Sequence, residues 1–482
     1  MAATSERGRV RPGVAAAARV VAFEALLRVE SEGAHADDLL RSREVDRLSA
    51  PDRDLATALV MGALRWQILL DAQIRGYLAR PDGKLDLPVR VALRLGALQL
   101  LRMDRIPDHA AIHESVALCR AAGHEHASRM VNAVLRRMAG ERKIPAKVAA
   151  SAGNAAELAE RTAHPLWLVE RWVSGFGMEQ ARLLCEHGQR QPEIVLRMAE
   201  DAAAAELIEA GCGLEPAWAL RCARRVTSGD WRGTDAWKRG RARAQDEGSQ
   251  LVAELAATSG LSDGVRILDC CAAPGGKAMI LAERNPGARV DACEISEARA
   301  EAMRARLATM SERSARIAVH CADAVEWMAR QAARSWEMVM VDAPCSGTGT
   351  LGRNPEIRHR LRVEDLARHS ARQLALLRAA MRASSERIVY ATCSLEPEEN
   401  QQVVAAALSG QAEWRLVSLE GTIRTLEANG IVTEAGAAWL RMGLHADGSL
   451  GMRTREVPGV GVMSADVVSV DGFYVAMLER VR

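Results

Sequence analysis

The stretch Val265-Arg-Ile-Leu-Asp-Cys-Cys-Ala-Ala-Pro-Gly-Gly-Lys277 decides the fold of the second half of this chain. It begins as a short apolar strand, passes through a tight Pro-Gly-Gly turn and continues as a helix from Ala278. Glycines let backbone approach a ligand, and the first N–H groups of a helix point toward it. The stretch therefore predicts a nucleotide-type pocket, although a plain corner between a strand and a helix can carry the same residues.

Apolar strands alternate with helical stretches from this point on. Strands are expected at 265–268, 289–293, 316–319, 338–341 and 387–390. This alternation is typical of an α/β domain with a doubly wound, Rossmann-like parallel sheet. Ligands bind to such sheets at the carboxyl ends of the strands, near the point where the strand order reverses. We expect this domain to span residues 246–482.

The first 142 residues have a different period. Apolar residues at spacings of three and four predict five helices, at 15–29, from Pro51, from Pro88, at 111–119 and at 127–140. Proline suits the first turn of a helix and Gly140 suits a C-terminal stop. Residues 1–142 are therefore expected to form an all-α bundle, with residues 1–13 frayed.

Residues 143–245 read as a linker followed by a small α+β domain. Helices are expected from Trp167 and over 178–187, and a strand over 194–198. The window 221–243 holds eight basic residues and two acidic ones. Such a window is either a solvated basic loop or a strip that contacts phosphates, and the residues alone leave both interpretations open.

Composition narrows the class of protein. The ten cysteines include no C-x-x-C pair, so we expect no metal site. Arg19 interrupts the apolar run nearest the N-terminus, and no uncharged run reaches the length of a membrane span. We therefore expect a cytoplasmic monomer with free thiols and no membrane partner.

Polar residues follow the predicted strands, as a binding edge requires. They are Cys271 to Lys277, Glu294, Asp323, Asp342 to Gly347, and Thr392-Cys393-Ser394. An aspartate before a helix is often an N-cap, and a cysteine is often a small buried apolar residue. Two cysteines at the ends of neighbouring strands, each beside small turn residues, favour a chemical role instead.

Two thiols beside such a pocket suggest chemistry on an electrophilic ring. A thiolate that adds to carbon 6 of cytosine makes carbon 5 nucleophilic enough to accept a methyl group from a sulfonium. Lys277 or a helix N-terminus is suited to lower the thiol pKa, and Asp342 to promote the addition as an acid. The base has to be flipped or single-stranded. The residues alone do not decide which cysteine attacks.

Three motifs in this order resemble the Sun-type rRNA cytosine-5 methyltransferases: Cys271-Ala-Ala-Pro-Gly-Gly-Lys277, Asp342-Ala-Pro-Cys-Ser-Gly347 and Thr392-Cys-Ser394 followed by Glu399-Asn400. Residues 107–115 and 131–136 resemble the NusB-like RNA-binding domain of one bacterial branch. Further likeness lies at 245–250, 352–356 and 471–476, so the resemblance covers nearly the whole chain. It implies a NusB-like bundle, a small RRM-like α+β domain and a class I methyltransferase domain.

The resemblance also implies the reaction and its residues. S-adenosyl-L-methionine would donate a methyl group to carbon 5 of a cytosine in 16S rRNA. The cofactor would be held by Cys271, Ala272, Ala273, Pro274, Gly275, Gly276 and Lys277, with Glu294 on the ribose, Asp323 on the adenine amine and Asp342 between cofactor and base. Cys393 would be the nucleophile, and Cys345 would assist product release.

Three positions depart from the family pattern. Glu294 stands where aspartate is usual, Arg358 where lysine is usual, and the segment 440–468 lacks the usual Pro-His pair. The last departure leaves the register of the C-terminal strands open. The basic window and the arginines at 353, 358, 360, 362, 368 and 372 are the candidates for RNA contact.

Other functions compete with this interpretation. The chain could be a non-catalytic RNA-binding or antitermination-type factor with a vestigial sheet, or it could carry out the same chemistry on tRNA. The intact cysteines and Asp342 argue against the first alternative. A dinucleotide oxidoreductase is disfavoured because no G-x-G-x-x-G follows the first strand.

Overall fold

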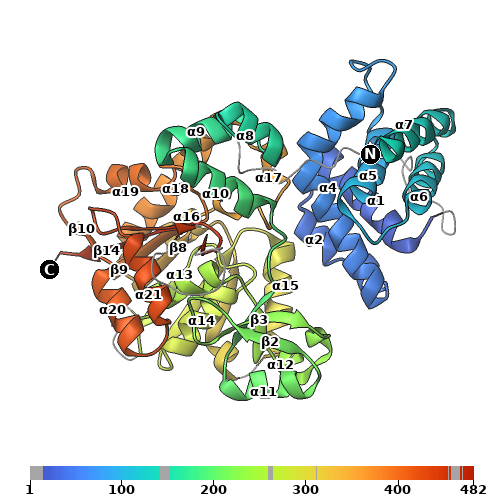
Figure 1. Cartoon of the computed structure of the whole chain (residues 1–482). Helices are drawn as coiled ribbons and strands as arrows, with labels where there is room; N and C mark the ends of the chain where they lie inside the picture. Colours follow the sequence, from blue (N-terminus) through green and yellow to red (C-terminus); the bar gives the residue numbers. More distant parts are fainter. Residues whose placement is uncertain are drawn as a thin grey trace. The chain divides into compact units, whose positions relative to one another are not determined.

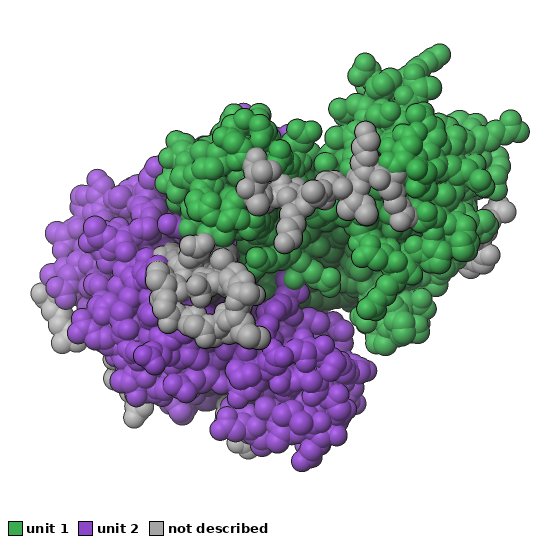
Figure 2. Space-filling view, in the orientation of Figure 1, with its two compact units in different colours: residues 1–191, 351–360 green, residues 192–350, 361–482 purple. Residues whose placement is uncertain are grey.

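A computed structural model describes residues 15–141, 152–258, 264–310, 312–453, 455–456, 467–468 and 470–481. The chain forms two compact units, one of residues 1–191 with 351–360 and one of residues 192–350 with 361–482 (Figure 2). The expectation for residues 1–13 lies outside the described residues, as does the one for much of the segment 440–468.

The first unit is helical throughout its described residues (Figure 1). Its elements are α1 Ala17–Ser31, α2 Ala36–Leu40, α3 Arg43–Asp46, α4 Ala50–Tyr77, α5 Leu87–Arg102, α6 Asp108–Ala121, η1 Glu125–Ala127, α7 Ser128–Gly140, α8 Ala155–Thr162, α9 Leu166–Phe176, α10 Met178–Gln189 and α17 Ile357–Arg360. The five long N-terminal helices predicted from the sequence are confirmed. α2 and α3 escaped prediction because they are too short to show an apolar period.

α4 is the central helix of this bundle. Its N-cap Ser49 accepts a hydrogen bond from the Asp52 N–H, and proline occupies the first turn. The helix is long and apolar enough to cross a membrane by composition alone. It packs against α1 and α5, with Leu59, Val60 and Leu64 in the core of the bundle. Burial inside the bundle accounts for its apolar character.

The segment 351–360 is held inside the helical unit by backbone carbonyls. Arg358, 3% exposed, donates to the carbonyls of Arg65, at 2.9 Å, and Gly188. Arg360 donates to two carbonyls of the same unit. Burial lowers the pKa of Arg358 to about 9. The expectation that Arg358 contacts RNA is therefore wrong, because its guanidinium is enclosed by protein.

A small sheet opens the second unit. Its strands β1 Val195–Met198, β2 Gly213–Pro216, β3 Ala223–Ser228 and β4 Ala242–Ala244 run antiparallel in the order β2-β3-β1-β4. α11 Asp201–Glu209, η2 Trp231–Gly233 and α12 Asp235–Lys238 lie between the strands in sequence. The predicted strand over 194–198 is confirmed, and the α+β class of this part is as expected.

The large sheet has the strand order β10-β14-β9-β8-β5-β6-β7, with β11 paired to β14. Its strands are β5 Arg266–Asp269, β6 Arg289–Glu294, β7 Ile317–Cys321, β8 Trp336–Asp342, β9 Ser384–Thr392, β10 Trp414–Val417, β11 Leu450–Met452 and β14 Phe473–Arg480; β12 Arg455–Glu456 pairs with β13 Val467–Val468 apart from it. The strands β5 to β9 are parallel, as predicted. The sheet as a whole is mixed, because β14 runs antiparallel to both β9 and β10.

Side chains of the parallel strands alternate between two cores. Ile267, Met338 and Met340 belong to one core, whereas Leu268 and Val339 belong to the other. The first core is completed by helices α13 Glu247–Ala257, α14 Gly276–Arg284, α15 Glu297–Ala308, α20 Glu420–Ala428 and α21 Glu434–Met442. The second is completed by α16 Ala324–Arg330, α18 Val363–Ala383 and α19 Gln401–Leu408. The sheet is therefore covered by helices on both faces.

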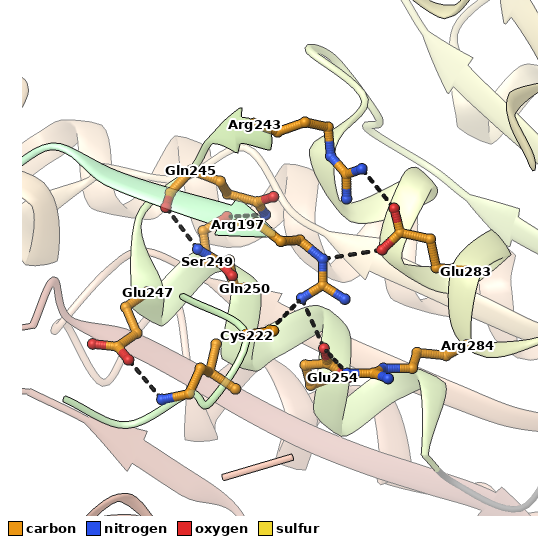
Figure 3. A network of polar contacts seen from close by, with 11 residues as sticks. Arg197, Cys222, Arg243, Gln245, Glu247, Ser249, Gln250, Glu254, Glu283 and Arg284 are labelled. Atoms are coloured by element: carbon orange, nitrogen blue, oxygen red, sulfur yellow. Dashed lines mark hydrogen bonds and ion pairs between the residues drawn. The ribbon is translucent and has the colours of Figure 1, made fainter. Parts of the chain in front are cut away.

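A buried ionic network joins the small sheet to α13 and α14 (Figure 3). Arg197 of β1 bonds to Glu254 at 2.8 Å and to Glu283 at 3.0 Å. Arg284 donates to both oxygens of Glu254 at 2.8 and 2.9 Å, and Arg243 of β4 lies 2.6 Å from Glu283. The side chains of Arg197 and Glu254 are 3% and 0% exposed. The network fixes α14, the helix whose first turn carries Lys277.

We expect Glu254→Gln to lower the free energy of unfolding by about 3 kcal/mol, since removing one partner leaves buried guanidinium charge without compensation. Denaturant unfolding of the full chain measures this loss. Glu301→Gln, an exposed glutamate of α15, is the matched control and should change stability by less than about 0.5 kcal/mol. Equal midpoints for the two variants would contradict a stabilising role for the network.

Candidate active site

The parallel strands bring the predicted polar residues to one edge of the sheet. In the sheet, β5 lies between β8 and β6. The chain runs from β5 to β6 and β7 on one side and then crosses to β8 on the other side, so the strand order reverses between β5 and β8. Lys277, just after β5, and Asp342, at the end of β8, meet across this reversal at 2.8 Å. Burial alone would lower the pKa of Lys277, but the Asp342 carboxylate raises it above its ordinary value. The ammonium therefore stays charged beside the carboxylate.

The Pro-Gly-Gly turn requires its glycines for two reasons. Gly275 has φ +95°, a backbone conformation that residues with a side chain rarely adopt. A Cβ on Gly276 would lie 2.8 Å from Gln245 Oε1. Gln245 begins the 245–250 motif, so that motif packs directly against the turn.

Asp269, the last residue of β5, was not among the residues predicted for the site. Its side chain is buried, and neither oxygen finds a hydrogen-bond partner in good geometry among the described residues. Burial first, and then the nearby Asp342 carboxylate, raise the pKa of Asp269 to about 7. A buried carboxylate without a partner is costly unless a ligand supplies donors.

The two cysteines of the predicted site lie together. Cys345 Sγ, in the loop after β8, is 3.3 Å from Cys393 Sγ, in the loop after β9. The contact with Cys393 and then burial raise the pKa of the Cys345 thiol well above its ordinary value, so Cys345 keeps its proton at neutral pH. Cys393 is among the groups that raise the pKa of Lys277, which puts its sulfur within electrostatic range of the ammonium.

Glu294 and Asp323 lie at the ends of the next two strands along the sheet. Glu294 ends β6, is 6% exposed and accepts a hydrogen bond from the Ser296 N–H at 2.9 Å. Asp323 is the N-cap of α16, where its Oδ1 accepts from the N–H groups of Val325 and Glu326 at 2.9 and 3.2 Å. The capping role considered for Asp323 is therefore present, and its assignment to an adenine amine stays a prediction.

Several basic residues of the window 221–243 pair with acids. Arg225 pairs with two glutamates, Arg241 pairs with Glu206, and Arg243 is buried in the network of Figure 3. Of the wider arginine set, Arg362, Arg368 and Arg372 are exposed. The interpretation of the whole window as a phosphate strip is wrong for Arg243, because a charge count does not show which basic residues face acids.

Glu399 is the functional candidate that the sequence identified only as part of a motif. Its carboxylate accepts hydrogen bonds from the residues that follow both cysteines, Ser346 and Ser394. The glutamate and Asn400 follow the Thr-Cys-Ser motif in the sequence, which was the only available signal. The contact of Glu399 with the Cys345 loop becomes visible only in three dimensions.

The residues at this edge fit S-adenosylmethionine. Asp269 offers two buried oxygens that make no hydrogen bond of good geometry within the described residues, and the compound carries an ammonium group and ribose hydroxyls that need acceptors. The turn at Gly275 and Gly276 places backbone at the start of α14, where ligand groups bind in sheets of this kind. Lys277, Asp342, Glu294 and the turn residues from Cys271 would hold the compound.

Comparisons with known proteins agree with this fold. Residues 257–479 match the family described as 16S rRNA methyltransferase RsmB/F, and residues 16–140 match the NusB family. The probable ribosomal RNA small subunit methyltransferase B of Bacillus subtilis (strain 168) is 32% identical over 403 residues, which cover 80% of this chain and 87% of the relative. The ribosomal RNA small subunit methyltransferase B of Pseudomonas putida is 32% identical over 402 residues, covering 81% and 88%.

Solved structures show the same fold. The crystal structure of PH0851 superposes with a TM-score of 0.73 at 20% identity and covers 97% of this chain and 98% of that one. A methyltransferase homolog protein from Pyrococcus horikoshii gives a TM-score of 0.52 at 19% identity, covering 69% and 100%. The class I methyltransferase fold predicted for the second half of the chain is therefore confirmed.

Asp269 should make the stability of the ligand-free protein depend on pH. An unfolded aspartate loses its proton near pH 3.9, whereas folded Asp269 keeps it to about pH 7. The folded state thus binds one more proton between these values, so the free energy of unfolding falls as pH rises through this window. We expect Asp269→Asn to flatten the decline between pH 4.5 and 7.5, by on the order of a few kcal/mol.

Calorimetric unfolding of both proteins across this range measures the difference. The pKa of Glu247 is also raised to about 7, chiefly by burial, and contributes the same decline to both proteins. Parallel pH profiles for wild type and Asp269→Asn would show that the Asp269 carboxyl ionises normally in the fold.

Proposed function

Because the chain belongs to the family of 16S rRNA methyltransferases RsmB/F, we propose that it methylates carbon 5 of a cytosine in 16S rRNA. It is an S-adenosylmethionine-dependent RNA methyltransferase with an N-terminal NusB-family domain. The proposal for cytosine rests on one observation, the 3.3 Å contact between Cys345 Sγ and Cys393 Sγ beside the Lys277–Asp342 pair. The substrate we propose is rRNA in an unstructured or early-assembly form, in the cytoplasm.

The chemistry assigns a separate task to each group. S-adenosylmethionine supplies an electrophilic methyl group when it is bound. Cys393, as a thiolate, forms a bond to carbon 6 of the cytosine, and the electron pair of the 5,6 double bond becomes available at carbon 5. Asp342, when it carries a proton, would donate it to the ring nitrogen as negative charge develops there during addition. The Lys277 ammonium, 2.8 Å from Asp342 Oδ2, adds positive charge to the same region.

Release requires the reverse of the addition. After carbon 5 has gained the methyl group, it loses its proton to a base, the 5,6 double bond forms again and the Cys393–carbon 6 bond breaks. The sulfur leaves as a thiolate. Cys345 keeps its proton at neutral pH and lies in contact with that sulfur. It is therefore suited to donate a hydrogen bond or a proton to the departing thiolate, which is the release role we propose for it.

We expect Cys393→Ala to abolish methyl transfer, by more than about 1,000-fold, because the neighbouring Cys345 thiol keeps its proton at neutral pH and is a poor nucleophile for the addition step. Affinity for S-adenosylmethionine, measured by calorimetry, should stay within about twofold, since the sulfur belongs to the base side of the site. Bisulfite sequencing of 16S rRNA from a deletion strain complemented with wild type or variant reads out the product. Cys321→Ala, an exposed cysteine at the end of β7, is the matched control. Wild-type methylation by Cys393→Ala would contradict the assignment.

Cys345→Ala should trap the enzyme on its substrate. If Cys345 assists the departure of Cys393, the variant completes the addition and releases the RNA slowly, so a covalent protein–RNA complex accumulates. A slow band on a denaturing gel, lost after RNase treatment, reports this complex. The double variant Cys345→Ala, Cys393→Ala should show no band. A band that persists in the double variant would assign the covalent bond to another residue.

A further inference from the structure

A buried carboxylate lies between the two cysteine loops, which we define as residues 343–350 after β8 and 393–400 after β9. Glu399 is 0% exposed. Its Oε1 accepts hydrogen bonds from the Ser346 N–H at 2.8 Å and from Gln373 Nε2 at 2.9 Å. Its Oε2 accepts from the hydroxyls of Ser346 and Ser394, the latter at 2.5 Å. No lysine or arginine pairs with it in the part of the chain that the structure describes.

Three of the four donors belong to the residues that directly follow the two cysteines. Ser346 follows Cys345, and Ser394 follows Cys393. One side chain therefore binds both loops at the residue next to each sulfur. Gln373 of α18 adds a third attachment, because its Nε2 also donates to the Pro344 carbonyl at 3.0 Å. The carboxylate and its partners thus tie together the residues next to each sulfur, and they add to direct bonds between the loops, such as that from the Gly349 N–H to the Cys393 carbonyl at 2.9 Å.

A carboxylate of this length satisfies all four donors as they stand. A glutamine offers one acceptor oxygen and would present N–H groups to donors, and an aspartate is one methylene shorter. Hydrogen bonds to an ionised acceptor are shorter and stronger than neutral ones. Burial of a negative charge without a cation is costly, and four hydrogen bonds are what compensates it here.

Glu399 is itself held in place. The Tyr390 hydroxyl donates to the Glu399 carbonyl at 2.5 Å. The next residue, Asn400, accepts from the Thr392 hydroxyl at 2.6 Å and donates to the Ser394 carbonyl at 2.9 Å. Since the backbone of Glu399 is held in this way, a shorter side chain at this position loses hydrogen bonds to at least one of the two loops.

We propose that Glu399 is a positioning residue that holds the Cys345 and Cys393 loops at the sulfur spacing needed for addition and release. Its catalytic meaning rests on the function proposed above, whereas the contact between the loops is a property of the fold. A residue with a merely structural role would lower stability and leave the spacing of the thiols and the turnover of folded enzyme unchanged.

The first test measures the spacing without RNA. Diamide oxidises two adjacent thiols to a disulfide, and its N=N bond takes up the two electrons and two protons that they lose. With the full chain, peptide mass mapping follows formation of the Cys345–Cys393 disulfide over time. Since the sulfurs lie 3.3 Å apart, wild type should form it rapidly. We expect Glu399→Asp to slow this reaction at least about tenfold, because it keeps the charge and loses the reach.

The second test measures turnover on 16S rRNA. In Glu399→Asp, kcat should fall about 100-fold while KM for RNA and the Kd for S-adenosylmethionine stay within about twofold, since misplacement by about 1 Å costs this much in rate. For Glu399→Gln, the rate of disulfide formation and kcat should both lie between the values of wild type and Glu399→Asp. Glu399→Gln keeps the length, and the serine hydroxyls can turn to accept from its amide. Glu386→Asp, an exposed glutamate of β9, is the matched control.

The outcomes separate this proposal from the proposed function. Slower disulfide formation in Glu399→Asp supports the positioning role even if wild type fails to methylate cytosine, and that failure would overturn only the function. Disulfide formation at the wild-type rate in folded Glu399→Asp and Glu399→Gln overturns the positioning role, whatever their turnover. Circular dichroism at the assay temperature establishes that each variant is folded. If Glu399→Asp does not fold, Glu399→Gln carries the comparison, and a wild-type rate there overturns the proposal.

Discussion

The hydrogen-bonded register of three parallel strands is the constraint on which the site depends. β5, β8 and β9 are adjacent, with Leu268 paired to Val339 and Val339 paired to Ile388. Parallel strands in register end at the same edge of a sheet, so Asp269, Asp342 and Thr392 come to lie together. Side chains 48 residues apart in sequence, as Cys345 and Cys393 are, then meet at 3.3 Å, and Lys277 and Asp342, 65 residues apart, meet at 2.8 Å. The cysteine contact, the Lys277–Asp342 pair and the Glu399 hydrogen bonds all follow from this arrangement.

Three buried carboxylates of the second unit show how the surroundings decide the use of a charge. Glu254 faces two arginines and joins the small sheet to α13 and α14. Glu399 faces four neutral donors and joins two loops. Asp269 faces no donor in good geometry and keeps its proton to about pH 7. The arrangement around Glu254 stabilises the fold, and the one around Glu399 positions the two cysteine loops. The arrangement around Asp269 leaves acceptor oxygens for a ligand.

The helical unit holds a piece of the chain that continues directly from the Cys345 loop. Leu351, six residues after Cys345, begins the segment that belongs to this unit. Buried arginines fix that segment through backbone carbonyls rather than through carboxylates, as Arg65 does with the Gly352 carbonyl at 2.9 Å. The same sequence features that suggest phosphate contacts, several arginines within a few residues, serve packing here. The exposed arginines of α18 and of the turn before it are the better candidates for RNA.

The sequence by itself determined the helical character of the N-terminal part, the five parallel strands and the chemical inventory of the site. The change of period near residue 265, the glycine turn and the two cysteine motifs predicted an α/β domain with polar strand ends, because these signals are local in the chain. Tertiary structure decided the rest: that β14 enters the sheet antiparallel, that Arg243 and Arg358 are buried, and that Glu399 bonds to both cysteine loops. Each of these features depends on contacts between segments that are distant in the sequence. Burial and pairing are properties of those contacts, whereas a local pattern of residues shows only which side chains are available to make contacts.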